Sequence, residues 1–163
     1  MRDTGNTVYV GPDDGQALRM PEGCLITRKV SSEQTGGAFS LFEAAVEPLG
    51  GSQPHVQHRE DECFYVLEGH FEFVIEGSKV GAGIGSLIYV SKGTLHAFKN
   101  VGESAGRLLV SQTPGGIYEG FIEEVGNPAT EKAGSPTAEK PPEADRLAEI
   151  GTKYGVEIVL SLP

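Results

Sequence analysis

Histidine and acidic side chains gather in two short blocks of the sequence, each opening at a glycine. The first block spans residues 50–62 and contains His55 and Glu62, and the second spans residues 85–96 and ends at His96. Imidazole nitrogens and carboxylate oxygens together suit iron, nickel, manganese, copper or zinc. An ionised glutamate at the start of a buried strand is costly without a cation or hydrogen-bond donors. These residues therefore predict one divalent metal site.

The spacing within the two blocks resembles the two motifs of the cupin superfamily. The residues that fit the first motif are His55, Glu62 and Gly69. The residues that fit the second motif are Gly85, Gly93, His96 and Asn100. Fifteen residues separate Gly69 from Gly85, which is a short distance between motifs for this family. The chain is therefore similar to small single-domain cupins over residues 38–125, and its closing residues 148–158 resemble the tails of the quercetin-dioxygenase-like members.

This resemblance implies a fold and a set of metal ligands. The implied fold is all-β, the double-stranded β-helix (jelly-roll) barrel of cupins. In such cupins two histidines and a glutamate from the first motif and one histidine from the second hold the ion. Carried onto this chain, the set is His55, residue 57, Glu62 and His96, with Glu62 also able to act as the catalytic base.

The sequence departs from the family pattern at residue 57, where Gln57 replaces a histidine. Gln57 can offer its amide oxygen, a weaker donor than imidazole for late transition metals. His58 is an alternative ligand, although in an extended strand it points away from residues 55 and 57 and would need a bulge to reach the ion. A third possibility is a weakened site with no fourth ligand. The second departure, Ser91 in place of a proline, leaves a turn at residues 91–93.

Apolar residues surround the predicted site and indicate the kind of ligand. By the two-residue period of a strand, Phe64 and Val66 share a face with Glu62, and Phe98 shares a face with His96. We expect a pocket with one polar centre and apolar walls, suited to a small aromatic or enol-type molecule. The resemblance implies a metal-dependent dioxygenase, an oxidoreductase. The alternative is a non-catalytic small-molecule-binding cupin whose metal site is impaired by Gln57.

The elements that must position these residues are predicted to be short strands. Turn residues separate apolar runs at 7–10, 24–30, 38–46, 62–67, 70–75, 86–90, 96–101 and 107–113. This pattern predicts a barrel or sandwich. Residues 64–67 and 71–75 are expected to pair as a hairpin around Gly69. His70 and the charged residues 58–61 are expected at the surface, and Asn100 is expected to stabilise a turn.

Beyond residue 115 the apolar spacing becomes helical. We predict a barrel with a packed short helix over residues 1–125, a flexible linker over 126–142, and a C-terminal helix and tail over 143–163. Within the last part, residues 143–154 are expected to be helical, and residues 156–160 form a closing strand or an extended tail.

Charge and composition limit the kinds of partner and the cellular location that we expect for this protein. The formal net charge is −10 and no cluster of Lys or Arg offsets it, so nucleic acid is not an expected partner. The N-terminus lacks the apolar segment of a signal peptide, and no run approaches 18 apolar residues, so we expect a cytoplasmic protein that does not enter membranes. Cys24 and Cys63 are expected as buried free thiols rather than one disulfide. A homodimer is expected, with an N-terminal strand closing an exposed sheet edge.

Overall fold

The computed structural model describes residues 2–3, 7–129 and 143–159. Most of this part of the chain is antiparallel β-structure. The strands are β1 (Arg2–Asp3), β2 (Val8–Tyr9), β3 (Gln16–Met20), β4 (Cys24–Val30), β5 (Ser40–Val46), β6 (His55–Gln57), β7 (Asp61–Glu68), β8 (Phe71–Ile75), β9 (Ser78–Ala82), β10 (Leu87–Val90), β11 (His96–Asn100), β12 (Gly106–Thr113), β13 (Asn127–Pro128) and β14 (Val156–Ile158). The helices are α1 (Ile117–Val125) and α2 (Ala144–Tyr154).

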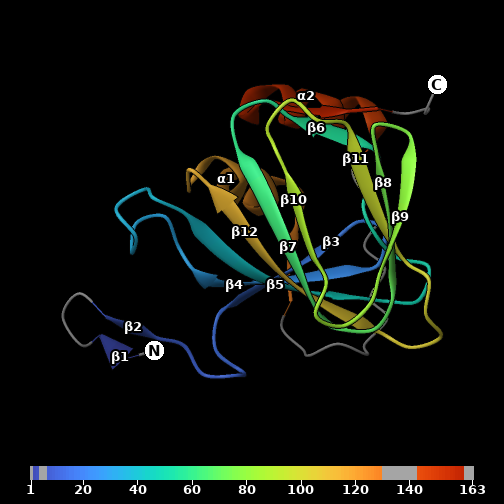
Figure 1. The fold of residues 1–163 in the computed structure, drawn as a ribbon. Helices are drawn as coiled ribbons and strands as arrows, with labels where there is room; N and C mark the ends of the chain where they lie inside the picture. The colour runs from blue at the N-terminus through green and yellow to red at the C-terminus, as the bar shows by residue number, and fades with distance from the viewer. Residues whose placement is uncertain (1, 4–6, 130–142, 160–163) are drawn as a thin grey trace.

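Two sheets face each other and enclose the core. The larger sheet has the strand order β10-β7-β12-β5-β4-β3-β13, and the smaller has the order β14-β6-β11-β8-β9. β1 and β2 pair only with each other among the described strands. Figure 1 shows the two sheets as opposite walls of one barrel, with α2 lying across the end at which β6 runs. The predicted fold, an all-β jelly-roll barrel with short C-terminal helices, is confirmed.

The core follows from the alternation of apolar residues along the strands. In β5 every second residue from Ser40 to Val46 is buried, and in β7 the same holds for Glu62, Phe64 and Val66. From the smaller sheet, Phe71 and Phe73 are fully buried. Side chains at alternate positions of a strand point to one face, so each sheet presents its apolar face to the other. The same period carries Glu62 into the interior.

The predicted hairpin between residues 64–67 and 71–75 is wrong. β7 pairs with β10 and β12, whereas β8 pairs with β9 and β11, so the two strands lie in different sheets. The turn at Gly69, with φ of +88°, carries the chain from one sheet to the other. The real hairpin joins β8 to β9 through Glu76 and Gly77, both of which have positive φ, as a tight hairpin turn requires.

The segments after the barrel dock onto it. α1 and α2 contact each other, and β14 pairs with β6 in the register Val156 to Gln57 and Ile158 to His55. The predicted closing strand is therefore formed over Val156–Ile158. Within the predicted linker, Asn127–Pro128 pair with β3, and residues 130–142 lie outside the described residues. No helix in the described ranges is long and apolar enough to cross a membrane.

The two cysteines are free thiols, as predicted. Cys24 is buried, and its thiol donates to the carbonyl oxygen of Gly51 at 3.1 Å. Burial raises the pKa of Cys24 to about 12, so this thiol stays protonated. Cys63 is only half-buried, because it lies on the outer face of β7.

Candidate metal site and pocket

The candidate site joins the two sheets at the centre of the barrel. His55 and His96 are paired residues on the neighbouring strands β6 and β11 of the smaller sheet, and Glu62 projects from β7 of the larger one. All three side chains are buried, and one ligand atom from each lies within 4.8 Å of the others. The rings of His55 and His96 are 4.3 Å apart between centroids. The structure therefore brings together three of the four residues that the resemblance implied as ligands.

Backbone carbonyl groups fix the orientation of both imidazole rings. His55 Nδ1 donates to the carbonyl oxygen of Gln53 at 2.8 Å, and His96 Nδ1 donates to that of Thr94 at 2.9 Å. A hydrogen bond at one ring nitrogen settles the tautomer and leaves the other nitrogen for a ligand, which is the arrangement typical of metal-binding histidines. Both Nε2 atoms are therefore the ones available at the centre of the site.

Glu62 is held from three sides. His96 Nε2 lies 2.8 Å from Oε2 of Glu62, Gln57 Nε2 donates to the same oxygen at 3.1 Å, and Gln112 Nε2 donates to Oε1 at 2.6 Å. These contacts fix the position of the Glu62 carboxylate inside the barrel. Gln112 was not identified from the sequence, although it faces inward on β12 by the same alternation that buries Leu108 and Val110.

The electrostatics of the two histidines differ. Burial, together with the positive charge of a protonated His96, lowers the pKa of His55 to about 4, so His55 is neutral at physiological pH. Burial by itself lowers the pKa of His96, but the hydrogen bond and the negative charge of Glu62 outweigh it, and the pKa of His96 is raised. The two imidazoles therefore differ in their affinity for a proton, because only His96 is hydrogen-bonded to Glu62.

Gln57 lies in the site and His58 does not. Gln57 is 3% exposed, and its Oε1 is buried with no hydrogen-bond partner among the described residues. His58 lies on the surface, where its Nε2 is 2.8 Å from Oε2 of Glu157. The alternative in which His58 replaces the missing histidine is therefore not supported by its position.

The residues present fit a divalent transition-metal ion. The donors are the Nε2 atoms of His55 and His96, a carboxylate oxygen of Glu62, and the unpartnered Oε1 of Gln57. Two imidazoles and two oxygens form a mixed donor set that suits iron, manganese, nickel, copper or zinc. Gln57 Oε1 is one of three buried amide oxygens without a partner among the described residues, and it would reach an ion once its Nε2 releases Glu62.

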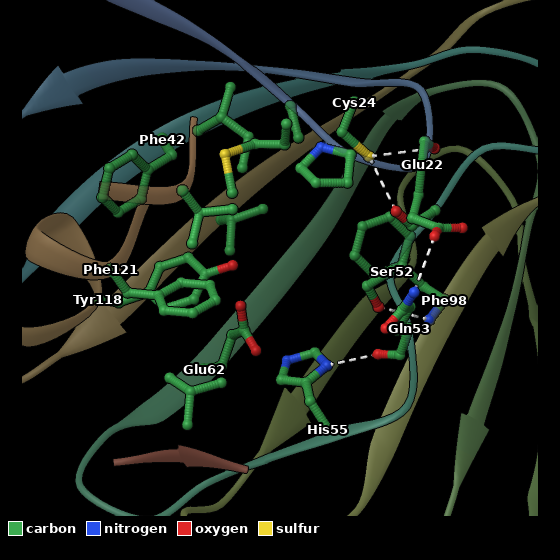
Figure 2. Close-up of a pocket in the computed structure, with 18 of the residues that line it drawn as sticks. Glu22, Cys24, Phe42, Ser52, Gln53, His55, Glu62, Phe98, Tyr118 and Phe121 are labelled. Atoms are coloured by element: carbon green, nitrogen blue, oxygen red, sulfur yellow. Dashed lines mark hydrogen bonds between the residues drawn. The ribbon is translucent and has the colours of Figure 1, made fainter. Parts of the chain in front are cut away.

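An apolar pocket opens beside the cluster, as the sequence predicted (Figure 2). Its cavity volume is about 100 Å³. Its aromatic walls are Phe42, Phe64, Phe98, Tyr118 and Phe121. His55 and Glu62 form the polar part of the wall, and α2 and β14 contribute Leu147, Val156 and Ile158. The expectation that Phe64 and Phe98 line a pocket is confirmed.

The structure confirms the predicted positions of two residues outside the site and corrects that of a third. His70 is exposed, and Asn100 stabilises turns by donating to the carbonyl oxygens of Val46 and Ser104. Glu60 was expected in a surface loop but is 2% exposed, and its Oε1 accepts the backbone N–H of Tyr118 at 2.8 Å. Glu60 therefore binds the first turn of α1, where an acidic group is favoured.

Comparison with known proteins supports the fold. Residues 42–111 match the model of the cupin domain family. Among curated proteins, none matches the sequence. A predicted oxalate decarboxylase from Thermotoga maritima aligns with a TM-score of 0.61 and 18% identity over 66% of this chain and 99% of that one.

Two further solved structures are similar. KdgF from Halomonas sp. aligns with a TM-score of 0.60 and 17% identity, over 66% of this chain and 94% of that one. The polyketide cyclase RemF from Streptomyces resistomycificus aligns with a TM-score of 0.58 and 25% identity, over 66% of this chain and 79% of that one. Each likeness leaves roughly a third of this chain outside the shared barrel.

Proposed function

We propose that this chain is a cupin-type, metal-dependent enzyme acting on a small aromatic or enol-type molecule. The match of residues 42–111 to the cupin domain family supports this proposal. The observation that carries this proposal is the convergence of His55, Glu62 and His96 within 4.8 Å beside an apolar pocket. The sequence resemblance favours a dioxygenase of the quercetin-dioxygenase-like kind. The polyketide cyclase among the similar structures acts, by its name, on a polyketide, which agrees with an organic substrate of this class.

In this proposal His55, Gln57, Glu62 and His96 would hold the ion. When bound, a divalent ion such as iron, nickel, manganese, copper or zinc supplies the positive charge that makes a nearby hydroxyl or enol more acidic. The residues then have separate tasks. Glu62, whose Oε1 is held by Gln112, keeps Oε2 directed into the cluster, where it is able to take a proton from a substrate hydroxyl.

The pocket walls serve the same chemistry by keeping water away. Phe64 and Phe98 border the polar centre, and their ring centroids are 5.6 Å apart. An apolar wall strengthens electrostatic interactions at the centre, because little solvent is present to screen them. An aromatic substrate would gain its binding free energy from these rings and its orientation from the polar centre.

The experiment that tests the proposal is a measurement of metal content by plasma mass spectrometry on tag-free protein. The wild type is compared with Glu62→Gln and His96→Ala, and with Glu157→Gln as a surface control, since the exposed Glu157 carboxylate pairs with the exposed His58. We expect near-stoichiometric metal in the wild type and the control, and loss of metal in both site variants. Oxygen consumption with flavonols and related enols then tests the dioxygenase reaction. Metal at background level after reconstitution would refute the proposed enzyme.

A second function is favoured by one specific observation. Gln57 uses its Nε2 to donate to Glu62, so in this arrangement its amide oxygen is turned away from that carboxylate. A cupin with this substitution could bind a small molecule without catalysis. This reading predicts that a Gln57→His variant gains metal affinity but shows no turnover, whereas turnover in the wild type would exclude it.

A further inference from the structure

The charges around the pocket are all of one sign. Among the described residues that line it, the charged side chains are Glu22 and Glu62, and neither lysine nor arginine is present. A phosphate or sulfate group is normally bound by arginine, lysine or a cluster of backbone N–H groups. Even with a divalent ion at the cluster, the rest of the pocket offers no cation to the distal part of a ligand. The lining therefore fits an uncharged molecule.

One polar group in the aromatic wall is free to bind such a molecule. The hydroxyl of Tyr118 makes no hydrogen bond within the described part of the chain, although the side chain lines the pocket. Figure 2 shows this hydroxyl directed toward the carboxylate of Glu62, on the side of the pocket opposite Gln53. Tyr118 is half-buried and lines the pocket, so a bound ligand would supply the partner that a covered tyrosine hydroxyl usually has.

The Tyr118 side chain is held in place by its surroundings. Its backbone N–H donates to Glu60 Oε1 at 2.8 Å, and its ring packs against Phe42 edge-on at 6.3 Å and against Phe121 in a stacked arrangement at 5.5 Å. A donor fixed before the ligand arrives loses little conformational entropy on binding. Burial and the nearby charge of Glu62 raise the pKa of Tyr118 well above its usual value, so the O–H proton is retained.

We propose that the pocket binds an uncharged, planar ring system carrying an oxygen acceptor, and that Tyr118 donates its O–H to that oxygen. The proposal rests on the proposed function, because it takes this pocket as the substrate site. It also makes α1 a determinant of specificity. α1 lies beyond residues 42–111, which match the family, so this donor belongs to a segment outside the matched domain.

The test compares two probes that differ only in the acceptor, 1-indanone and indane. Their binding is followed by NMR of methionine methyl groups, because Met20 lines the pocket and the chain has only one other methionine, Met1. Wild type is compared with Tyr118→Phe, which removes one oxygen, and with Tyr154→Phe. The Tyr154 hydroxyl donates to Glu124 outside the pocket, so this second variant is a matched control.

In the wild type and the Tyr154 control, we expect 1-indanone to bind about 2- to 12-fold more tightly than indane, as one net hydrogen bond provides. In Tyr118→Phe this preference disappears while the affinity for indane is kept. Phenyl phosphate, the anionic probe, is expected to leave the Met20 signal unshifted. An unchanged ketone preference in Tyr118→Phe, or binding of phenyl phosphate at least as tight as that of 1-indanone, would overturn the proposal.

Repeating the titrations on EDTA-treated protein separates this proposal from the metal site. A ketone preference that depends on Tyr118 both before and after EDTA supports the proposal, even where metal analysis has refuted the proposed enzyme. A preference that is lost with EDTA and is indifferent to Tyr118→Phe assigns the acceptor to the ion and overturns the role of Tyr118, while leaving the metal site intact.

Discussion

The substitution Gln57→His offers the sharpest test of how the site is built. Residue 57 is buried on the same strand as His55, and its position is fixed because Gly93 N–H donates to its carbonyl oxygen at 2.8 Å and Val156 pairs with it across β14. An imidazole at this position would point into the cluster as His55 does. We therefore expect the variant to bind a divalent transition metal more tightly than the wild type.

The size of the effect follows from the hydrogen bond that Gln57 makes. For the amide oxygen of Gln57 to reach an ion, the amide must release Glu62, to which its Nε2 donates at 3.1 Å. A hydrogen bond to a charged group contributes about 1.5 to 3 kcal/mol, and every 1.4 kcal/mol is a tenfold change in affinity. Histidine avoids this loss and is also the stronger donor, so we expect about 10- to 100-fold tighter binding.

The assay is competition for zinc against a chelating dye at neutral pH, with thermal melting to confirm that each variant is folded. Two variants serve as controls. Gln57→Leu removes the amide and is expected to bind zinc more weakly than the wild type. His58→Gln alters an exposed residue that pairs with Glu157 and is expected to bind zinc as the wild type does. An affinity of folded Gln57→His within twofold of the wild type would refute the assignment of residue 57 to the ligand set.

Three further predictions concern the fold and the assembly. Burial raises the pKa of Glu60 to about 7, despite the hydrogen bond from Tyr118 N–H, whereas in the unfolded chain the pKa is 4.5. Between these two values the folded protein keeps a proton that the unfolded chain has lost. The free energy of unfolding should therefore fall by roughly 3 kcal/mol as pH rises from 4.5 to 7. In urea unfolding of EDTA-treated protein, Glu60→Gln should lack this decline, and an equally steep decline would contradict the assignment. Gly51→Ala would place a Cβ 2.0 Å from the carbonyl oxygen of Phe98 and should cost more than about 2 kcal/mol by the same assay, whereas Gly81→Ala, which meets nothing within 4 Å, should be nearly neutral. Light scattering should give a homodimer of twice 17.3 kDa, because β10 is an edge strand that exposes Leu87 and Tyr89, and a monomeric mass would exclude it.

The interior of the barrel was predictable from the sequence because burial in a strand has a two-residue period. That period placed Phe64 and Val66 on the face of Glu62, and the structure buries all three. The motif spacing likewise predicted that His55, Glu62 and His96 would meet, although they come from three strands and two sheets. The two-residue period is a local signal, and the motif spacing is a number of residues along the chain, so both can be read from a single sequence.

Pairing between strands was harder to predict, because it depends on partners far along the chain. Gly69 has the composition of a hairpin turn, yet β7 and β8 enter different sheets. Nothing near Gly69 distinguishes a turn that pairs two strands from a turn that crosses the barrel. Glu60 was misread for the same reason, since the N–H group that it binds belongs to Tyr118, far along the chain.

The site and the specificity of this barrel come from different parts of the chain. The candidate ligands lie within residues 42–111, which match the family, and their carbonyl supports and strand register are set by the barrel. Part of the pocket wall comes from α1, α2 and β14, all of which follow the matched residues. β14 also pairs with β6, the strand of His55 and Gln57, so a change in the C-terminal segment would act on the ligands as well as on the wall. Substrate choice and metal affinity in this protein should therefore vary together when α2 and β14 are altered, and separately when only the Tyr118 hydroxyl is removed.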